Sequence, residues 1–528
     1  MAVLQTSVLV VGGGPVGLTL SALLSGYGVD HVLVETHPTT SRHPKARGIS
    51  ARSMEIFRRI GLEEQVRGAG LPAEQVYFYR GRDLVDPDFV RTGLARQPDN
   101  DDGDEHTPSP GIICSQDALE PVLLRRAVEL AGARIRFGRR LVSFTDDGLG
   151  VLAVVEDADT GSRYQVRADW LVGCDGAAST VRNGAGIPMA GPTGLGRYLS
   201  IRFEAPLGQV VADRASASYF LTTPGRGGFM AVDNDRHWIY QYPLPTDTPE
   251  PDPSAPDPSD HRHLVGLIRT AAGIPDLDVT VRDTMTWRMD AQLATAYRRS
   301  RVLLAGDAAH VIPPTGGHGM NTGIGDVDNL AWKLAAVTTG YAGDALLDSY
   351  EAERRPVARQ VIDISMANAQ NRAGYRIDDE LLLTATYQST AILPDPDTAP
   401  IQTGLSPDGY RPGCHPGQRL PHVRLTGGDA GVTSTLDLVG PGFTLLTATY
   451  DPAWRGQAET VQQTGIPLAF QAVNTAGRRE ASPGLWGRLV GIGGAPGAVL
   501  VRPDGHVAWR GTDPAVDLQA VLRRVLSS

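Results

Sequence analysis

Apolar residues at the start of the chain follow a pattern that predicts a strand, a helix and a second strand. Residues 7–11 form the continuous apolar run expected of a buried parallel strand. Residues 18–26 are typical of an apolar helix, and residues 31–35 are expected to form the second strand. Residues 39–59 are expected to form a further helix that ends near Gly61. This order of elements predicts an α/β domain with a parallel sheet.

The pattern changes twice further along the chain. Between residues 188 and 284 apolar and polar residues alternate in segments such as 238–242, which predicts an antiparallel sheet with one buried face. After a Pro/Gly-rich stretch at 406–421, the chain is expected to form a small separate α/β domain. Its predicted elements are two strands and a closing helix, at residues 443–449, 497–502 and 516–526.

Composition narrows the class of protein. The 528 residues are 41% hydrophobic and 20% charged, with a net charge of -10, so a nucleic-acid partner is not expected. No apolar run reaches the ~18 residues that span a bilayer, and no membrane partner is expected. The three cysteines form no C-x-x-C pair, which favours a reduced, cytoplasmic protein without a metal site. Acidic, proline-containing stretches at 95–110 and 246–260 are expected to be surface loops.

A glycine-rich turn follows the first strand and opens the first helix. In Gly12-x-Gly14-x-x-Gly17, glycine permits the tight turn, close approach of the backbone to a pyrophosphate, and close packing of helix on strand. The helix N-terminus then offers free N–H groups to the phosphates. Glu35 ends the second strand, where a carboxylate accepts ribose hydroxyls and repels a 2′-phosphate. The motif predicts FAD or NAD rather than NADP; the alternative is a ligand-free turn.

A second segment, residues 301–334, favours FAD. A buried strand at 302–305 leads to Gly306 and Asp307, and a loop rich in Pro and Gly leads to Asn321 and a helix. The Asp307 carboxylate can accept a ribityl or ribose hydroxyl. The loop places backbone N–H groups beside a helix N-terminus, where they can face a flavin carbonyl. The alternative is an unusually glycine-rich turn without a ligand.

These motifs resemble those of the single-component FAD-dependent aromatic hydroxylases, the superfamily of para-hydroxybenzoate hydroxylase. Residues 301–334 are similar to its GD motif, and residues 171–183, with Asp175, are similar to its DG motif. Residues 44–62 resemble the segment whose arginine, here Arg47, reaches the flavin. Gln116 matches a glutamine that contacts the ribityl or phosphate part, and Leu141 aligns with a backbone position beside adenine. Thr36 departs from the Arg or Lys common after the ribose-binding acid.

By this resemblance FAD is the cofactor, and NADPH or NADH is a transient reductant. The resemblance implies FAD-binding roles for Gly12, Gly14, Pro15, Val16, Gly17, Glu35, Thr36, Arg47, Gln116, Leu141, Asp175, Asp307, Pro314, Gly317, Gly319, Met320 and Asn321. Pro314 would border the reactive edge of the flavin through its backbone. His318 stands in the same loop, and we expect it to face solvent rather than to act in the site.

The expected fold is α/β: a Rossmann-like FAD domain, an inserted mixed or antiparallel sheet domain for the substrate, and a C-terminal thioredoxin-like domain. The FAD domain comprises residues 1–187 and 285–400, and the substrate domain residues 188–284 with part of 72–110. The C-terminal domain comprises residues 401–528. It has no C-x-x-C, so it does not exchange dithiols.

Five aromatic residues of the middle block are candidates for lining the substrate site, although a core position is favoured for them: Tyr219, Phe229, Trp238, Tyr240 and Tyr242. Alternation puts Trp238, Tyr240 and Tyr242 on one face of a strand. The sequence identifies no general base. His237 and His310 are candidates, but a structural role is favoured for each.

The C-terminal domain and overall pattern resemble bacterial hydroxylases of polycyclic aromatic polyketides in antibiotic-type biosynthesis, which implies O2 and an aromatic small molecule as substrates. A simple phenol hydroxylase and a Baeyer–Villiger oxygenase stay open on this scaffold. From another class, an NAD-binding dehydrogenase or a non-catalytic dinucleotide-binding protein is the alternative that the GD segment disfavours. A homodimer is open as well as a monomer.

Overall fold

The protein is described by a computed structural model, which covers residues 3–93, 105–223, 225–245, 256–370, 378–396, 403–428, 431–491 and 497–527. Most of the two expected surface loops, 95–110 and 246–260, lies outside these residues. The described end of the first is partly buried, contrary to expectation: Thr107 and Ser109 are enclosed, and Thr107 Oγ1 donates a 2.6 Å hydrogen bond to Glu55 Oε1.

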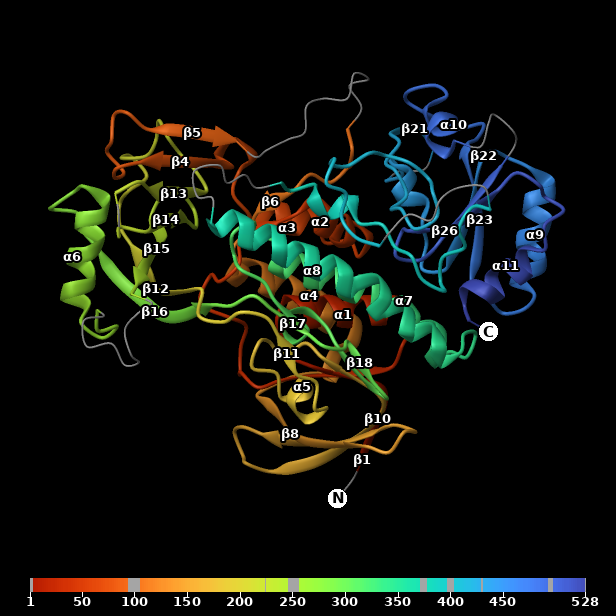
Figure 1. The fold of residues 1–528 in the computed structure, drawn as a ribbon, viewed down its shortest axis with the longest axis horizontal. Helices are drawn as coiled ribbons and strands as arrows, with labels where there is room; N and C mark the ends of the chain where they lie inside the picture. The colour runs from red at the N-terminus through yellow and green to blue at the C-terminus, as the bar shows by residue number, and fades with distance from the viewer. Residues whose placement is uncertain are drawn as a thin grey trace.

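Within the described residues, the first sheet has eight strands, two of which, β1 and β10, are labelled in the lower part of Figure 1. Its strand order is β18-β19-β10-β1-β2-β7, and all neighbours in this path are parallel except β18. The first predicted strand, helix and second strand are confirmed. The strands are β1 (Val3–Val11), β2 (His31–Glu35), β7 (Ile135–Phe137), β10 (Arg163–Gly173), β18 (Arg298–Arg299) and β19 (Val302–Leu304).

Helices cover one face of this sheet, and an antiparallel extension continues from β10. Helix α1 (Pro15–Gly26) packs against both α4 (Gln116–Ala131) and α7 (Gly319–Thr338), and α8 (Asp348–Gln370) packs against α7. Their apolar side chains form one large core with the strands. The extension and its helix are β8 (Arg139–Asp146), β9 (Val151–Asp157) and α5 (Thr180–Gly184).

The helix expected at residues 39–59 is wrong in its first half. Only α2 (Ala51–Arg59) is helical, and it is followed by α3 (Glu63–Ala69). Pro44 lacks the N–H that a helix interior needs, and proline also disfavours helical geometry in the residue before it. Ser50 caps α2 by accepting a hydrogen bond from the backbone N–H of Ser53. Residues 36–47 therefore form a loop, which leads into the short pair β3 (Gly48–Ile49) and β6 (Ile112–Ile113).

The second sheet lies at the left of Figure 1, between helix α6 and the helices of the first sheet. Its order is β16-β12-β15-β14-β13-β4-β5, antiparallel except for the parallel pair of β13 and β4. Helix α6 (His261–Ala272) packs into the core on one face. The strands are β4 (Tyr77–Gly81), β5 (Val90–Gly93), β12 (Gly196–Glu204), β13 (Ser218–Leu221), β14 (Gly228–Ala231), β15 (His237–Leu244) and β16 (Thr280–Met289).

The C-terminal part has the thioredoxin-like arrangement, with strand order β23-β22-β25-β26 and only β22 and β23 parallel. Its main elements are β22 (Phe443–Thr449), α9 (Pro452–Gln462), β23 (Leu468–Asn474), α10 (Leu485–Val490), β25 (Ala498–Val501), β26 (Val507–Gly511) and α11 (Leu518–Val525). The residue limits of the three domains given above stay a proposal, which a limited proteolysis map would test.

Short elements complete the structure. The strands are β11 (Met189–Ala190), β17 (Gln292–Ala294), β20 (His310–Val311), β21 (Leu425–Gly427) and β24 (Arg478–Glu480). The 3-10 turns are η1 (Ala73–Gln75), η2 (Gly132–Arg134), η3 (Gly306–Ala308), η4 (Asp344–Leu347), η5 (Leu381–Thr384) and η6 (Thr435–Leu438). All three cysteines are free thiols, and burial raises the pKa of both Cys114 and Cys414 to about 12. Among the described helices, none has the length and apolarity to cross a bilayer.

Candidate active site

The glycine turn forms a cradle that only glycine can build. Gly12 has φ of 109°, and a Cβ at this position would overlap the carbonyl oxygen of Cys174. A Cβ at Gly17 would overlap the carbonyl oxygen of Gly12. At Gly14, by contrast, a Cβ would meet nothing within 4 Å. The turn is therefore closed on the protein side and open beside Gly14, just before Pro15 and Val16, which begin α1. This space suits a pyrophosphate at the helix N-terminus.

Glu35 lies directly beside this turn. Its Oε2 accepts a 2.6 Å hydrogen bond from the backbone N–H of Gly13, and its Oε1 accepts a 2.8 Å bond from the N–H of His37. The intervening Thr36 is exposed. Leu141 is buried in β8, which packs against β2. The carboxylate is thus positioned at the end of β2 where a ribose would lie.

The DG segment lies behind the glycine turn. Asp175 follows β10, and its carboxylate accepts hydrogen bonds from Ser179 Oγ (2.5 Å) and from the backbone N–H of Val181 (3.1 Å). Burial raises the pKa of Asp175, because it disfavours the charged form more than these bonds favour it. Arg182 donates to the carbonyl of Ala308, 3.2 Å away. The DG segment is therefore joined to the GD segment, where the Asp307 side chain is exposed.

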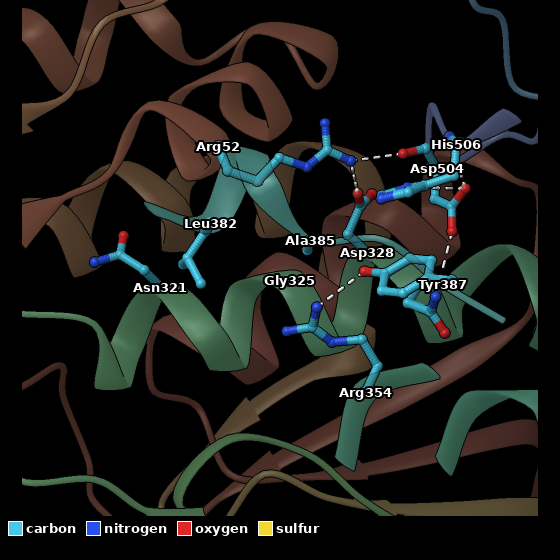
Figure 2. A pocket seen from close by; sticks show the side chains of 11 residues that line it. Arg52, Asn321, Gly325, Asp328, Arg354, Leu382, Ala385, Tyr387, Asp504 and His506 are labelled. Carbon is cyan, nitrogen blue, oxygen red and sulfur yellow. Dashed lines mark hydrogen bonds and ion pairs between the residues drawn. The ribbon is translucent and has the colours of Figure 1, made fainter. Parts of the chain in front are cut away.

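Asn321, whose side chain is labelled in Figure 2, bonds to three backbone groups in two loops at the predicted flavin position. Its Oδ1 accepts a hydrogen bond from Ser50 N–H at 2.9 Å. Its Nδ2 donates to the carbonyls of Gly48 (2.9 Å) and Gly317 (2.7 Å). Pro314 closes the turn before it, since its carbonyl accepts hydrogen bonds from the N–H groups of residues 316 and 317. Gly319 and Met320 form the first residues of α7. Asn321 thus holds the loop before α2 against the loop before α7.

The expectation that His318 faces solvent is wrong. Its exposed fraction is 3%, because it lies under the loop as the residue that precedes α7. Burial lowers the pKa of His318 to about 4, so the ring is neutral at pH 7. Its Nδ1 has no hydrogen-bond partner in the described part of the chain. The loop therefore holds a buried polar atom without a partner where the flavin is expected, which fits a bound group.

Arg47 lies between the loop at residues 36–47 and the second sheet. Its guanidinium donates to the carbonyls of Ala217 (2.8 Å) and Ala231 (2.7 Å) and to Ser218 Oγ (2.8 Å). From α4, Gln116 Oε1 accepts a hydrogen bond from Ala46 N–H at 3.3 Å. This loop, which carries the predicted flavin arginine, is therefore fixed against both α4 and the sheet.

The contact between Arg47 and Ser218 identifies the face of the second sheet that meets this loop. Cross-strand partners share a face, so the register extends it across the sheet. We call it the inner face; its residues include Tyr198, Ser200, Ser218, Met230, Ile239, Gln241 and Trp287. On it, Tyr198 and Trp287 are half-buried and their rings stack with centroids 4.5 Å apart.

The five aromatic candidates lie on the opposite, outer face. Tyr219, Phe229, Trp238 and Tyr240 are at most 1% exposed and pack with α6 in the core of this sheet, while Tyr242 is half-buried against it. The rings of Phe229 and Tyr240 stack at 4.7 Å. The structure thus places these residues in the core, the alternative that the sequence favours for them. The inner face is therefore the side of the sheet that can meet a substrate.

Both histidines considered as bases are paired with carboxylates. His237 lies on the surface, 2.5 Å from Asp233. His310 is fully buried, and its Nε2 lies 2.6 Å from Asp326, which also accepts a 2.9 Å hydrogen bond from Arg354. Sequence reasoning passed over His43, whose ring contacts the inner face through Ser200 (2.8 Å) and Asp283 (3.0 Å). These partners are 157 and 240 residues away, so no local motif marks the contact.

The fold and this site define an FAD-binding oxygenase. The site combines the glycine turn, the carboxylate of Glu35 and the loops before α2 and α7. The chain belongs to the FAD-dependent aromatic-ring hydroxylases: residues 5–365 match the FAD-binding domain family, and residues 414–528 match the family "Aromatic-ring hydroxylase, C-terminal". It is a flavin-dependent monooxygenase, and FAD is its cofactor. Bound FAD supplies the redox and oxygen chemistry, while the chain supplies binding, orientation and electrostatics.

Relatives match over the whole chain. Tetracenomycin B2 monooxygenase-dioxygenase of Streptomyces olivaceus is 38% identical over 548 residues, covering 99% of this chain and 98% of that protein. The flavin-dependent monooxygenase PieE, solved with FAD and substrate, has a TM-score of 0.88 at 32% identity, with 99% of each chain covered. Aklavinone-11 hydroxylase, solved with FAD and aklavinone, has a TM-score of 0.85 at 34% identity and full coverage of both chains.

Proposed function

We propose that this monooxygenase hydroxylates a polycyclic aromatic polyketide, using O2 and NADPH or NADH. The inner face of the second sheet carries the proposal, because it combines a half-buried aromatic pair with polar groups beside the flavin loops. An extended, flat aromatic substrate fits such a wall better than a single ring does. Relatives named for tetracenomycin and aklavinone support the same substrate class.

The chain has two tasks in this reaction. Arg47, held by two carbonyls and Ser218, keeps the flavin loop against the inner face, so cofactor and substrate wall stay in register. The sheet also shields the reacting atoms from water, which favours oxygen transfer over loss of the oxidant as peroxide. A single-ring phenol as substrate and a Baeyer–Villiger outcome are the alternatives on the same scaffold.

Stimulation of NADPH oxidation tests the substrate class. With FAD-loaded enzyme, a four-ring phenolic quinone such as aklavinone should raise the NADPH oxidation rate at least about tenfold, with most of the NADPH used for product. Single-ring phenols such as 2,4-dichlorophenol should raise it much less, since they contact only part of the wall. Equal or greater stimulation by single-ring phenols would refute the polyketide assignment. Parallel assays with NADH give the reductant preference.

A homodimer is also part of the proposal. Light scattering of the FAD-loaded chain distinguishes a dimer from a monomer of 56.2 kDa.

A further inference from the structure

Four hydrogen bonds form a continuous chain across the inner face. Trp287 Nε1 donates to Gln241 Oε1 at 3.1 Å, and Gln241 Nε2 donates to Ser200 Oγ at 2.9 Å. Ser200 Oγ lies 2.8 Å from His43 Nε2, and His43 Nδ1 lies 3.0 Å from Asp283 Oδ2. With a neutral His43 that carries its proton on Nδ1, every donor in the chain points the same way, from Trp287 toward Asp283.

The last three members of this chain have the connectivity of a Ser-His-Asp triad, but the site is not built for nucleophilic attack. Ser200 is fully buried, and its Oγ already accepts the hydrogen bond from Gln241. A nucleophilic serine needs an open approach for a carbonyl and donors for the oxyanion. The hydrogen-bonded chain therefore orients side chains. Asp283, its exposed end with a side chain that is 48% exposed, fixes the His43 tautomer.

Two members of this hydrogen-bonded chain, His43 and Trp287, belong to different parts of the site. His43 lies in the loop that carries Arg47, and its carbonyl accepts a 3.1 Å hydrogen bond from Ser41 Oγ. The neighbouring carbonyl of Arg42 accepts a 2.6 Å bond from Arg202 of β12. In β16, Trp287 stacks on Tyr198. The chain thus connects the flavin-side loop to the aromatic pair of the proposed substrate wall.

We propose that His43 is a positioning residue of the substrate site, which orients Gln241 and Trp287 through Ser200. The inference rests on the proposed function. With Nε2 bonded to Ser200 and Oε1 to Trp287, the half-buried Gln241 amide retains one N–H and one lone pair. This pair matches the carbonyl and hydroxyl that stand side by side on the edge of a polycyclic phenolic quinone. His43 holds the amide in the orientation that presents both.

The indole N–H of Trp287 reports on the chain without any substrate. In FAD-loaded protein labelled with 15N-tryptophan, its resonance is the one that Trp287→Phe removes. We expect His43→Leu to shift this resonance, because loss of the ring releases Ser200 and then Gln241. His237→Gln is the matched control: it alters an exposed His–Asp pair on the same sheet and should leave the resonance in place. An unchanged resonance in His43→Leu would overturn the relay.

Binding of a polycyclic probe tests the functional part. We expect His43→Leu and Gln241→Leu each to raise the dissociation constant of 1,8-dihydroxyanthraquinone about tenfold, and the double variant to raise it no further. His43→Gln, which keeps a polar atom near the Nε2 position, should recover most of the affinity. Multiplicative effects in the double variant would overturn the proposal, as would weaker FAD binding with unchanged probe affinity. If wild type binds neither this probe nor aklavinone, the proposed substrate class fails, while the indole shift still decides the relay.

Discussion

Replacing Gly14 by alanine should give a folded protein that no longer retains FAD. The backbone at Gly14, with φ of -78° and ψ of -173°, suits any residue, and a Cβ there meets no protein atom within 4 Å. The methyl group would instead occupy the space that a pyrophosphate needs for close approach to the turn. We expect the FAD dissociation constant to rise about 100-fold, or about 2.8 kcal/mol. Titration of the apoprotein with FAD, followed by flavin fluorescence, measures it.

Two other glycines serve as controls for this effect. Gly26, at the far end of the same helix, also has open space at its Cβ, so Gly26→Ala should leave FAD affinity unchanged. Gly17→Ala should lower the yield of folded protein, because its Cβ would overlap the Gly12 carbonyl. Wild-type FAD affinity in a folded Gly14→Ala variant would show that the cofactor lies elsewhere.

Replacing Arg502 by methionine should destabilise the chain by about 3–5 kcal/mol, the range for removal of one partner of a buried ion pair. Arg502 is fully buried and donates to both carboxylate oxygens of Glu353 in α8, at 2.7 and 2.9 Å, and it also pairs with Asp504. Asp504 accepts a 3.2 Å hydrogen bond from Trp332 in α7. The C-terminal domain is thus joined to α7 and α8 through buried charges, of which Figure 2 labels Asp504.

Urea unfolding followed by circular dichroism measures this loss. Arg455→Met is the matched control, since Arg455 pairs with Glu459 on the surface of α9 and should cost under about 0.5 kcal/mol. Burial alone would raise the pKa of Glu353, but Arg502 and Lys333 hold it well below 4.5. The stabilisation is therefore complete above the unfolded pKa and is lost as pH falls toward the folded pKa. The difference in free energy of unfolding between wild type and Arg502→Met should therefore narrow below about pH 4.5. If Arg502→Met and Arg455→Met lose equal stability at pH 7, a stabilising role for the buried cluster is contradicted.

Local motifs account for what the sequence predicts correctly. The turn at Gly12, the carboxylate at Glu35 and the loop before Asn321 each depend on neighbours within about one supersecondary unit, so their spacing carries the geometry. The predicted helix at 39–59 is correct only from Ala51 on, because Pro44 prevents a helix in the segment before it. A glycine-rich loop usually lies on the surface and favours a solvent-facing His318, whereas this loop covers its own histidine.

Long-range register explains what the sequence could not supply. Alternation shows that Trp238 and Tyr240 share a face, but it does not tell which face meets the flavin loop. That depends on the contact between Arg47 and Ser218, 171 residues apart. The bonds of His43 to Ser200 and Asp283 have the same origin, and for this reason the hydrogen-bonded chain on the inner face emerges only from the structure.

The most direct test of the central claim is the mass of the product formed under 18O2. FAD-loaded enzyme, NADPH and aklavinone or a related polycyclic phenol should give a product that gains one 18O atom as a new hydroxyl, with every ring intact. Gain of 18O within a lactone would instead mean a Baeyer–Villiger reaction. A product without 18O, or NADPH oxidation that yields only hydrogen peroxide with every polycyclic phenol, would contradict the account.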